Sequence, residues 1–267
     1  ELLGDPCQKP KQNCMAFGPN AQFAEERGYG RLVSKEEALQ VLDDAEKAVR
    51  GIDRDSLAAA AGMCIEAVLS GGTLYFCGNG GSAVDSQHLA GELVSRFRVE
   101  RPGIRAVSLA SNVAVITAIA NDYDFDMIYS RQVETLGRRG DVLVAISTSG
   151  ESANVLRAAE AAHDAGMKVI ALTGSGASAL ASAADCAFVS PSGETSHSQE
   201  AMLIAGHAIC DAVERACAGS AGSASPVQAF TKTILRASQR VRIILIFARS
   251  SANGRALEFY RENILYL

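Results

Sequence analysis

The chain has 267 residues, of which 48% are hydrophobic and 21% charged, and its formal net charge is −5. This length and composition fit one large globular α/β domain with appendages and exclude a disordered chain. The longest apolar run, residues 243–248, is too short to cross a bilayer, and the acidic balance gives no reason to expect nucleic acid on the surface. We therefore expect no membrane or nucleic-acid partner. Seven scattered cysteines without a C-x-x-C pair predict reduced thiols, so we expect a cytoplasmic protein.

The chain begins with residues 1–35, which lack hydrophobic periodicity and are expected to form an irregular arm. Ser34 followed by Glu37 predicts a capping box for a helix over about 35–50, and a second helical pattern covers about 54–70. Five short strand-like runs then alternate with helix-length segments: Thr73–Cys77, Ala106–Leu109, Val142–Ile146, Val169–Leu172 and Ala187–Val189. This alternation predicts an α/β fold with a doubly wound, five-stranded parallel sheet in three layers, preceded by N-terminal helices.

The predicted domain covers residues 36–217 and ends with a helix over about 197–217. Residues 218–267 are interpreted as a linker and a basic extension. Residues 219–267 carry seven Lys/Arg and two Asp/Glu, a balance of +5, against 18 and 28, or −10, for residues 1–218. The extension is compatible with a packing helix, a surface-binding tail or sequence unrelated to the domain, and the pattern leaves these alternatives open.

A glycine-rich loop, G-N-G-G-S-A at 78–83, follows the first predicted strand. It matches the G-x-G-x-x-G/A dinucleotide fingerprint, but that fold also needs an acidic residue at the end of the second strand. That end here is L-A-S-N at 109–112, without an acid, so no nucleotide cofactor is expected. The glycines instead favour close approach of the backbone to an anion, such as phosphate, at a helix N-terminus.

A second loop, S-T-S-G-E-S at 147–152, follows the third predicted strand and has four hydroxyls directly ahead of a helix. Alone, such a loop is more typical of a capped turn. Because ligands of doubly wound sheets bind at the carboxyl ends of the strands, two anion-suited loops there predict a phosphate site.

Two helices carry polar side chains suited to acid–base or metal chemistry. His88 and Glu92 are spaced i,i+4 and share one helix face, although such a pair is often only a solvated surface interaction. Gln199 and His207 lie on the final helix, where eight residues correspond to a rise of about 12 Å. We therefore expect these two to ligate one ion only if the helix start is irregular or another subunit contributes.

The order of six motifs resembles the SIS-domain phosphoheptose isomerases. The motifs are C-G-N-G-G-S at 77–82, D-x-x-H-x-x-x-E at 85–92, A-N-D at 120–122, I-S-T-S-G-x-S-x-N-V at 146–155, A-L-T-G at 171–174, and Q-E with a His eight residues after the Gln at 199–207. The match covers residues 36–217, so the resemblance says nothing about either terminal segment.

The resemblance implies a homotetrameric SIS fold whose active sites draw on more than one subunit. It assigns phosphate binding to Ser82, Ser147, Thr148, Ser149 and Ser152. It places five further residues near the sugar: Asn79, Gly80, Gly81, Asn121 and Asp122. It assigns one zinc ion per subunit to His88, Glu92, Gln199 and His207, of which Glu92 and Gln199 also face the substrate.

The implied reaction converts sedoheptulose 7-phosphate to D-glycero-D-manno-heptose 7-phosphate, which feeds heptose units of bacterial surface glycans such as lipopolysaccharide. Aldose–ketose interconversion moves a proton between C1 and C2 through an enediol, so it needs a base beside carbon and an acid near oxygen. Glu92 is our candidate base and His207 its acid–base partner.

Three other functions are compatible with parts of the sequence. Non-catalytic SIS tetramers that bind a replication initiator lack the Glu and the late His, so Glu92 and His207 favour an enzyme. A sugar-phosphate sensor would ordinarily carry a DNA-binding domain, and no helix-turn-helix pattern precedes residue 36. A nicotinamide-dependent enzyme is disfavoured by the missing acidic residue.

Overall fold

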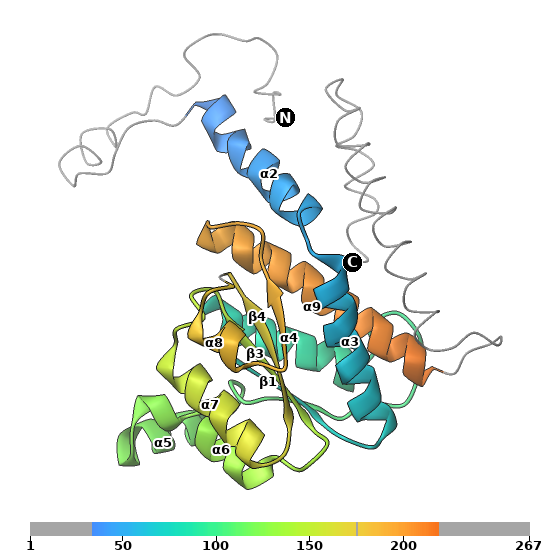
Figure 1. The fold of residues 1–267 in the computed structure, drawn as a ribbon, viewed down its shortest axis with the longest axis vertical. Helices are drawn as coiled ribbons and strands as arrows, with labels where there is room; N and C mark the ends of the chain where they lie inside the picture. The colour runs from blue at the N-terminus through green and yellow to red at the C-terminus, as the bar shows by residue number, and fades with distance from the viewer. Residues whose placement is uncertain (1–33, 175, 219–267) are drawn as a thin grey trace, which may run out of the picture. The chain divides into compact units, whose positions relative to one another are not determined.

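The computed structural model describes residues 34–174 and 176–218 (Figure 1). Two compact units divide the chain between Val41 and Leu42, and the first contributes only the beginning of α2 to the described residues. None of the helices in the described ranges is long and apolar enough to span a membrane. The predicted arm over 1–35 and the extension over 218–267 lie almost entirely outside these ranges, so the proposed domain bounds stay a prediction.

Two helices precede the sheet, as predicted. In α2 (Lys35–Arg50) the capping box forms, because the Ser34 backbone N–H donates to Glu37 Oε2 at 2.9 Å and the Glu37 N–H donates to Ser34 Oγ at 3.1 Å. In α3 (Arg54–Leu69) the cap is Asp53, whose carboxylate accepts the N–H groups of Asp55 and Ser56. Both helices therefore begin where side-chain acceptors satisfy the otherwise unpaired first-turn N–H groups.

The sheet has five strands, all parallel, which confirms the predicted fold class. They are β1 (Leu74–Gly78), β2 (Ala106–Ser108), β3 (Val142–Ser147), β4 (Lys168–Thr173) and β5 (Cys186–Val189). Their spatial order is β2-β1-β3-β4-β5. The order reverses between β1 and β3, where Gly78 pairs with Ile146. In doubly wound sheets this switch point opens the crevice in which ligands bind.

The helices after β1 are α4 (Gly81–Val94), α5 (Val113–Asp122), the 3-10 helix η1 (Phe125–Met127), α6 (Ser130–Leu136), α7 (Ala153–Asp164), α8 (Ala179–Ala183) and, following β5, α9 (Thr195–Cys217). Alternate strand residues face opposite layers. Phe76 and Val144 join the core formed with α3, α4 and α9, whereas Tyr75 and Leu143 join the core formed with α6 and α7. The sheet is thus covered on both faces, as the apolar strands predict and as Figure 1 shows.

The first helix has the predicted bounds, Lys35–Arg50, and the predicted bounds of other elements differ from the observed ones by one or two residues. The first strand is shifted by one residue, to Leu74–Gly78, and the final helix begins at Thr195 instead of residue 197. The backbone ladder continues beyond the apolar run at Gly78 and at Ser147, which pairs with Thr173, so hydropathy alone does not mark the strand ends.

Candidate active site

The glycine loop crosses directly from β1 into α4. Gly80 has φ +55°, a left-handed conformation that favours glycine, and Gly81 begins the helix. A Cβ atom at Gly78 would lie 2.8 Å from the Ile146 carbonyl oxygen, so the end of β1 approaches β3 too closely for a side chain. The loop therefore presents backbone at the N-terminus of α4, as expected for an anion site. Ser82, in the first turn of α4, is buried.

The serine loop follows β3 and precedes α7. Ser147 Oγ lies 3.2 Å from Ser152 Oγ and 3.4 Å from Ser149 Oγ, so three hydroxyls converge. Gly150, at φ +68°, makes the turn, and its N–H donates to Ser147 Oγ at 3.1 Å. Ser152 occupies the N-cap position of α7, but its hydroxyl makes no capping hydrogen bond. Converging hydroxyls at a helix N-terminus suit a phosphate group. Thr148, between them, is partly exposed.

A pair of asparagines joins the two loops. Asn79 Nδ2 donates to Asn154 Oδ1 at 2.8 Å, and Asn154 Nδ2 donates to Asn79 Oδ1 at 2.9 Å. The Tyr129 hydroxyl donates to the Gly78 carbonyl from the same side. These bonds fix the glycine loop relative to the start of α7 at the switch point of the sheet.

Three side chains of α4 and α9 gather into a potential metal site. The ligand atoms of His88, Glu92 and His207 all lie within 4.8 Å of one another. His88 Nε2 is 2.8 Å from His207 Nε2 and 3.6 Å from Glu92 Oε1. The first separation is a hydrogen-bond distance, so without an ion one of the two imidazoles must carry a proton on Nε2. Two imidazole nitrogens and a carboxylate oxygen are a donor set that suits zinc.

The surroundings of His207 favour its neutral form. Burial lowers the pKa of His207, and the neighbouring His88 and Arg98 lower it further. The Phe97 ring stacks on the imidazole with centroids 5.5 Å apart and planes at 22°. A neutral imidazole is the form that binds a metal ion or accepts a proton.

Gln199 lies between the glycine loop and a buried carboxylate. Its Nε2 donates to Asp85 Oδ2 at 2.9 Å, and its amide fills the space above Gly81. Burial raises the pKa of Asp85, while the hydrogen bond from Gln199 and the charge of His88 oppose that rise. The structure therefore brings Gln199 to the start of α4, at Gly81, which precedes Asp85 by four residues and His88 by seven, about two helical turns.

Asn121 and Asp122 lie elsewhere in the fold. They end α5 in the layer opposite α4 and α9, both are exposed, and Asn121 Nδ2 donates to Asp122 Oδ1 at 2.8 Å. Within one chain the structure does not bring them together with the histidine cluster.

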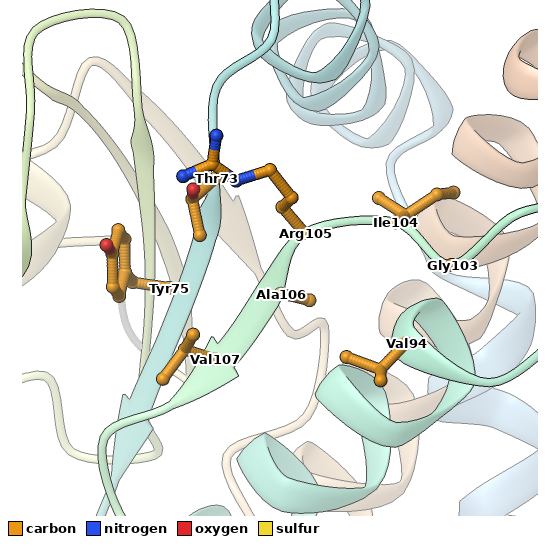
Figure 2. Close-up of a pocket in the computed structure, with 8 residues that line it drawn as sticks. All are labelled: Thr73, Tyr75, Val94, Gly103, Ile104, Arg105, Ala106 and Val107. Atoms are coloured by element: carbon orange, nitrogen blue, oxygen red, sulfur yellow. The ribbon is translucent and has the colours of Figure 1, made fainter.

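A separate pocket of about 400 Å³ is shown in Figure 2. It is lined by Thr73, Tyr75, Val94 and residues 103–107. Thr73 precedes β1 and Arg105 precedes β2, so the pocket lies beside the amino ends of these strands. The polar loops lie at the opposite, carboxyl ends, and the chemistry is therefore not located in this pocket.

Sequence reasoning gave no role to three residues that contact the candidate site. Asp85 lies three residues before His88, a spacing that places both on one helix face, so periodicity offered a signal. Asn154 is in the quoted serine motif, but its partner is 75 residues away. Phe97 follows α4 in a segment without regular structure, and no spacing rule predicts its contact with His207.

The fold and the loops at its switch point define a class of protein, the SIS domain. The family model described as SIS domain matches residues 39–174. The match spans half of the chain and includes both polar loops together with His88 and Glu92.

Comparison with curated proteins narrows the class. The chain is 48% identical to a phosphoheptose isomerase from Rhodospirillum rubrum over 161 residues, covering 60% of this chain and 86% of the relative. It is 44% identical to one from Shewanella piezotolerans over 182 residues, covering 67% and 90%. A solved phosphoheptose isomerase from Francisella tularensis superposes with a TM-score of 0.66 at 35% identity, covering 69% of this chain and all of that one. The chain therefore belongs to the phosphoheptose isomerase family of SIS-domain proteins.

Proposed function

We propose that the protein is a sugar-phosphate isomerase that converts sedoheptulose 7-phosphate to D-glycero-D-manno-heptose 7-phosphate through an enediol. The observation that carries the proposal is the cluster of His88, Glu92 and His207, because α4, which holds two of these residues, begins at the anion-suited glycine loop. The relatives at 43–48% identity are phosphoheptose isomerases, which supports the same reaction. The product would enter the synthesis of heptose-containing surface glycans such as lipopolysaccharide.

The substrate phosphate is proposed to bind the serine loop. Ser147, Ser149 and Ser152 supply converging hydroxyls, and the N-terminus of α7 supplies N–H groups and positive potential. Thr148 completes this loop, and Ser82 supplies a hydroxyl from the first turn of α4. The sugar would then extend along the glycine loop, Asn79 to Gly81, toward Glu92 and Gln199.

The acid–base chemistry is assigned to Glu92 and His207. Glu92 removes a proton from C1 of the ketose, which leaves an enediol between C1 and C2. Return of a proton to C2 completes the aldose, while His207 moves the proton between the two oxygens. Its lowered pKa supports this role, because a neutral imidazole can both accept and donate a proton. A carboxylate partly withdrawn from solvent on the same face suits the carbon-bound proton.

A zinc ion fits the residues present. His88, Glu92 and His207 would hold it, and the ligand atoms already lie within 4.8 Å of one another. Gln199 is the fourth ligand that the family resemblance suggests, although here its amide donates to Asp85. When bound, zinc would supply Lewis-acid stabilisation of negative charge on the substrate oxygens.

We further propose a homotetramer in the cytoplasm. Asn121 and Asp122 lie in the layer opposite the histidine cluster, so they would reach a sugar only in a neighbouring subunit's site. The cysteines at 64, 77, 186, 210 and 217 are free thiols, which suits a reducing compartment. The alternative of a non-catalytic, initiator-binding tetramer is not favoured, because such an adaptor needs neither Glu92 nor His207.

The test compares Glu92→Gln with Glu100→Gln. Glu100 is a matched control because its side chain is 88% exposed and lies just beyond α4. Loss of the general base should lower kcat by about 10²- to 10⁴-fold, with inhibition by inorganic phosphate unchanged. Full activity of Glu92→Gln would refute the assignment of the base.

A further inference from the structure

The segment between α4 and β2 packs an aromatic ring against the candidate active site. Phe97 stacks on His207, which in turn meets His88 edge-on with ring centroids 5.0 Å apart. The Arg98 guanidinium lies 5.0 Å from the Phe97 centroid, and Arg98 Nε is 3.5 Å from Asp211 Oδ1 on α9. The orientation of the His207 imidazole thus depends on where this irregular segment lies.

One carboxylate of α9 accepts hydrogen bonds from the backbone N–H groups of that segment. Glu214 Oε1 accepts the Phe97 N–H at 2.8 Å, and Glu214 Oε2 accepts those of Arg98 at 2.7 Å and Val99 at 3.2 Å. Glu214 follows His207 by seven residues, two helical turns on the same face of α9. The helix that carries His207 therefore also holds the ring that packs on it.

A buried arginine links the same carboxylate to the end of α4. Arg101 Nε is 3.2 Å from Glu214 Oε1, and each side chain is only 1% exposed. Its guanidinium donates to the carbonyl oxygens of Glu92 at 3.0 Å and Leu93 at 2.7 Å. These carbonyls belong to the last turn of α4, which has no further helical N–H groups to bond, so Arg101 caps that helix.

We propose that Arg101 and Glu214 are positioning residues for the isomerase reaction. Together they fix the end of α4, which carries Glu92, against α9, which carries His207, and they hold Phe97 on the imidazole. In the part of the chain that the structure describes, the hydrogen bonds and the ion pair of both side chains go to α4, α9 and residues 95–102, so they act on the placement of the acid–base pair and not on phosphate binding. The expected effect on kcat rests on the proposed function, whereas the packing of Phe97 on His207 can be measured without substrate turnover.

The chain contains no tryptophan, so Phe97→Trp introduces a single tryptophan, whose emission can be excited selectively over that of the tyrosines, on the segment. In the full-length chain, Glu214→Gln keeps the size of the side chain but replaces one accepting oxygen by a donor, which cannot accept an N–H. Glu100→Gln makes the same chemical change at an exposed position of the same segment and serves as the matched control. Acrylamide quenching and the emission maximum then report whether the side chain at position 97 becomes exposed to solvent in the folded protein.

We expect Phe97→Trp/Glu214→Gln to be quenched more strongly and to emit further to the red than Phe97→Trp/Glu100→Gln. In the chain with Phe97 retained, Glu214→Gln should lower kcat about tenfold or more, because small misplacements of reacting groups are costly. Inhibition by inorganic phosphate should not change, which separates positioning from general damage to the fold.

Unchanged quenching together with unchanged kcat in the Glu214→Gln proteins would overturn the proposal. If Glu214→Gln does not fold, Phe97→Leu decides, since it removes the stacked ring and leaves the buried ion pair intact. A lower kcat with unchanged phosphate inhibition then supports the proposal, and wild-type kcat overturns it. A wild-type chain without isomerase activity would count against the proposed function, while the fluorescence would still report the seating of residue 97.

Discussion

Replacing Gly81 with alanine should displace Gln199 from the candidate active site. A methyl group at position 81 would lie 2.7 Å from Gln199 Oε1 and 2.9 Å from its Cδ, and closer still to Nε2. Gly81 does not have a positive φ, so alanine suits the backbone and the strain falls on the glutamine. Because the contact is with the end of a flexible side chain, Gln199 will move and lose its hydrogen bond to Asp85.

The expected magnitude follows from that single hydrogen bond. A hydrogen bond to a charged group contributes about 1.5–3 kcal/mol, and the better helix propensity of alanine offsets at most about 1 kcal/mol. The variant should therefore lose about 1–2 kcal/mol of unfolding free energy and remain folded. If Gln199 faces substrate and metal as proposed, the same displacement should lower kcat/KM about ten- to hundredfold.

The matched control is Gly91→Ala in the same helix. A Cβ atom there meets nothing within 4 Å, so the fold should gain up to about 1 kcal/mol and activity should not change. Urea unfolding and isomerase kinetics measure both quantities for the two variants. Equal kcat/KM for Gly81→Ala and Gly91→Ala would refute the reasoning about Gln199.

Three further predictions concern the metal, the histidine and the buried thiols. Zinc at 100 times its dissociation constant should raise the unfolding free energy by about 2.7 kcal/mol in the wild type but not in His88→Gln, as measured by urea unfolding with a chelator control. The pKa of His207 is lowered in the folded state, so as the pH falls through 6.5 the imidazole is protonated in the unfolded chain before it is protonated in the folded chain. Stability of the metal-free protein should therefore fall as the pH drops below about 6.5, and this loss should be smaller in His207→Gln; an equal loss would contradict the shift. Burial raises the pKa of the Cys64 and Cys77 thiols to about 12, so both should resist iodoacetamide in the native protein, and mass spectrometry showing rapid labelling at either would contradict the packing.

Much of the fold follows from local patterns. The apolar runs predicted all five strands. Burial on both faces explains the continuous apolar runs of β1, β3 and β4, whereas the edge strands β2 and β5 are only partly buried. The capping box of Ser34 and Glu37 predicted the start of α2, since both partners lie within one turn. The order β2-β1-β3-β4-β5 was not predicted, because it depends on packing between segments distant in sequence.

The candidate site was predictable where its residues lie in one helix or one loop. His88 and Glu92 share a helix face, and the three serine hydroxyls lie within the six residues 147–152, so spacing brought each group together. His88 and His207 are 119 residues apart in the sequence, and their contact depends on how α4 packs against α9. The Arg101–Glu214 pair gave no signal either, since a lone arginine and glutamate far apart in the sequence are usually surface residues.

The most direct test of the proposed reaction is proton NMR of the purified protein with sedoheptulose 7-phosphate in deuterated water, with added zinc and with a chelator. We predict the appearance of an aldoheptose 7-phosphate that carries deuterium at C2, because the enediol is protonated there from groups that exchange with solvent. A folded protein that produces no aldose under any metal condition would contradict the proposed function.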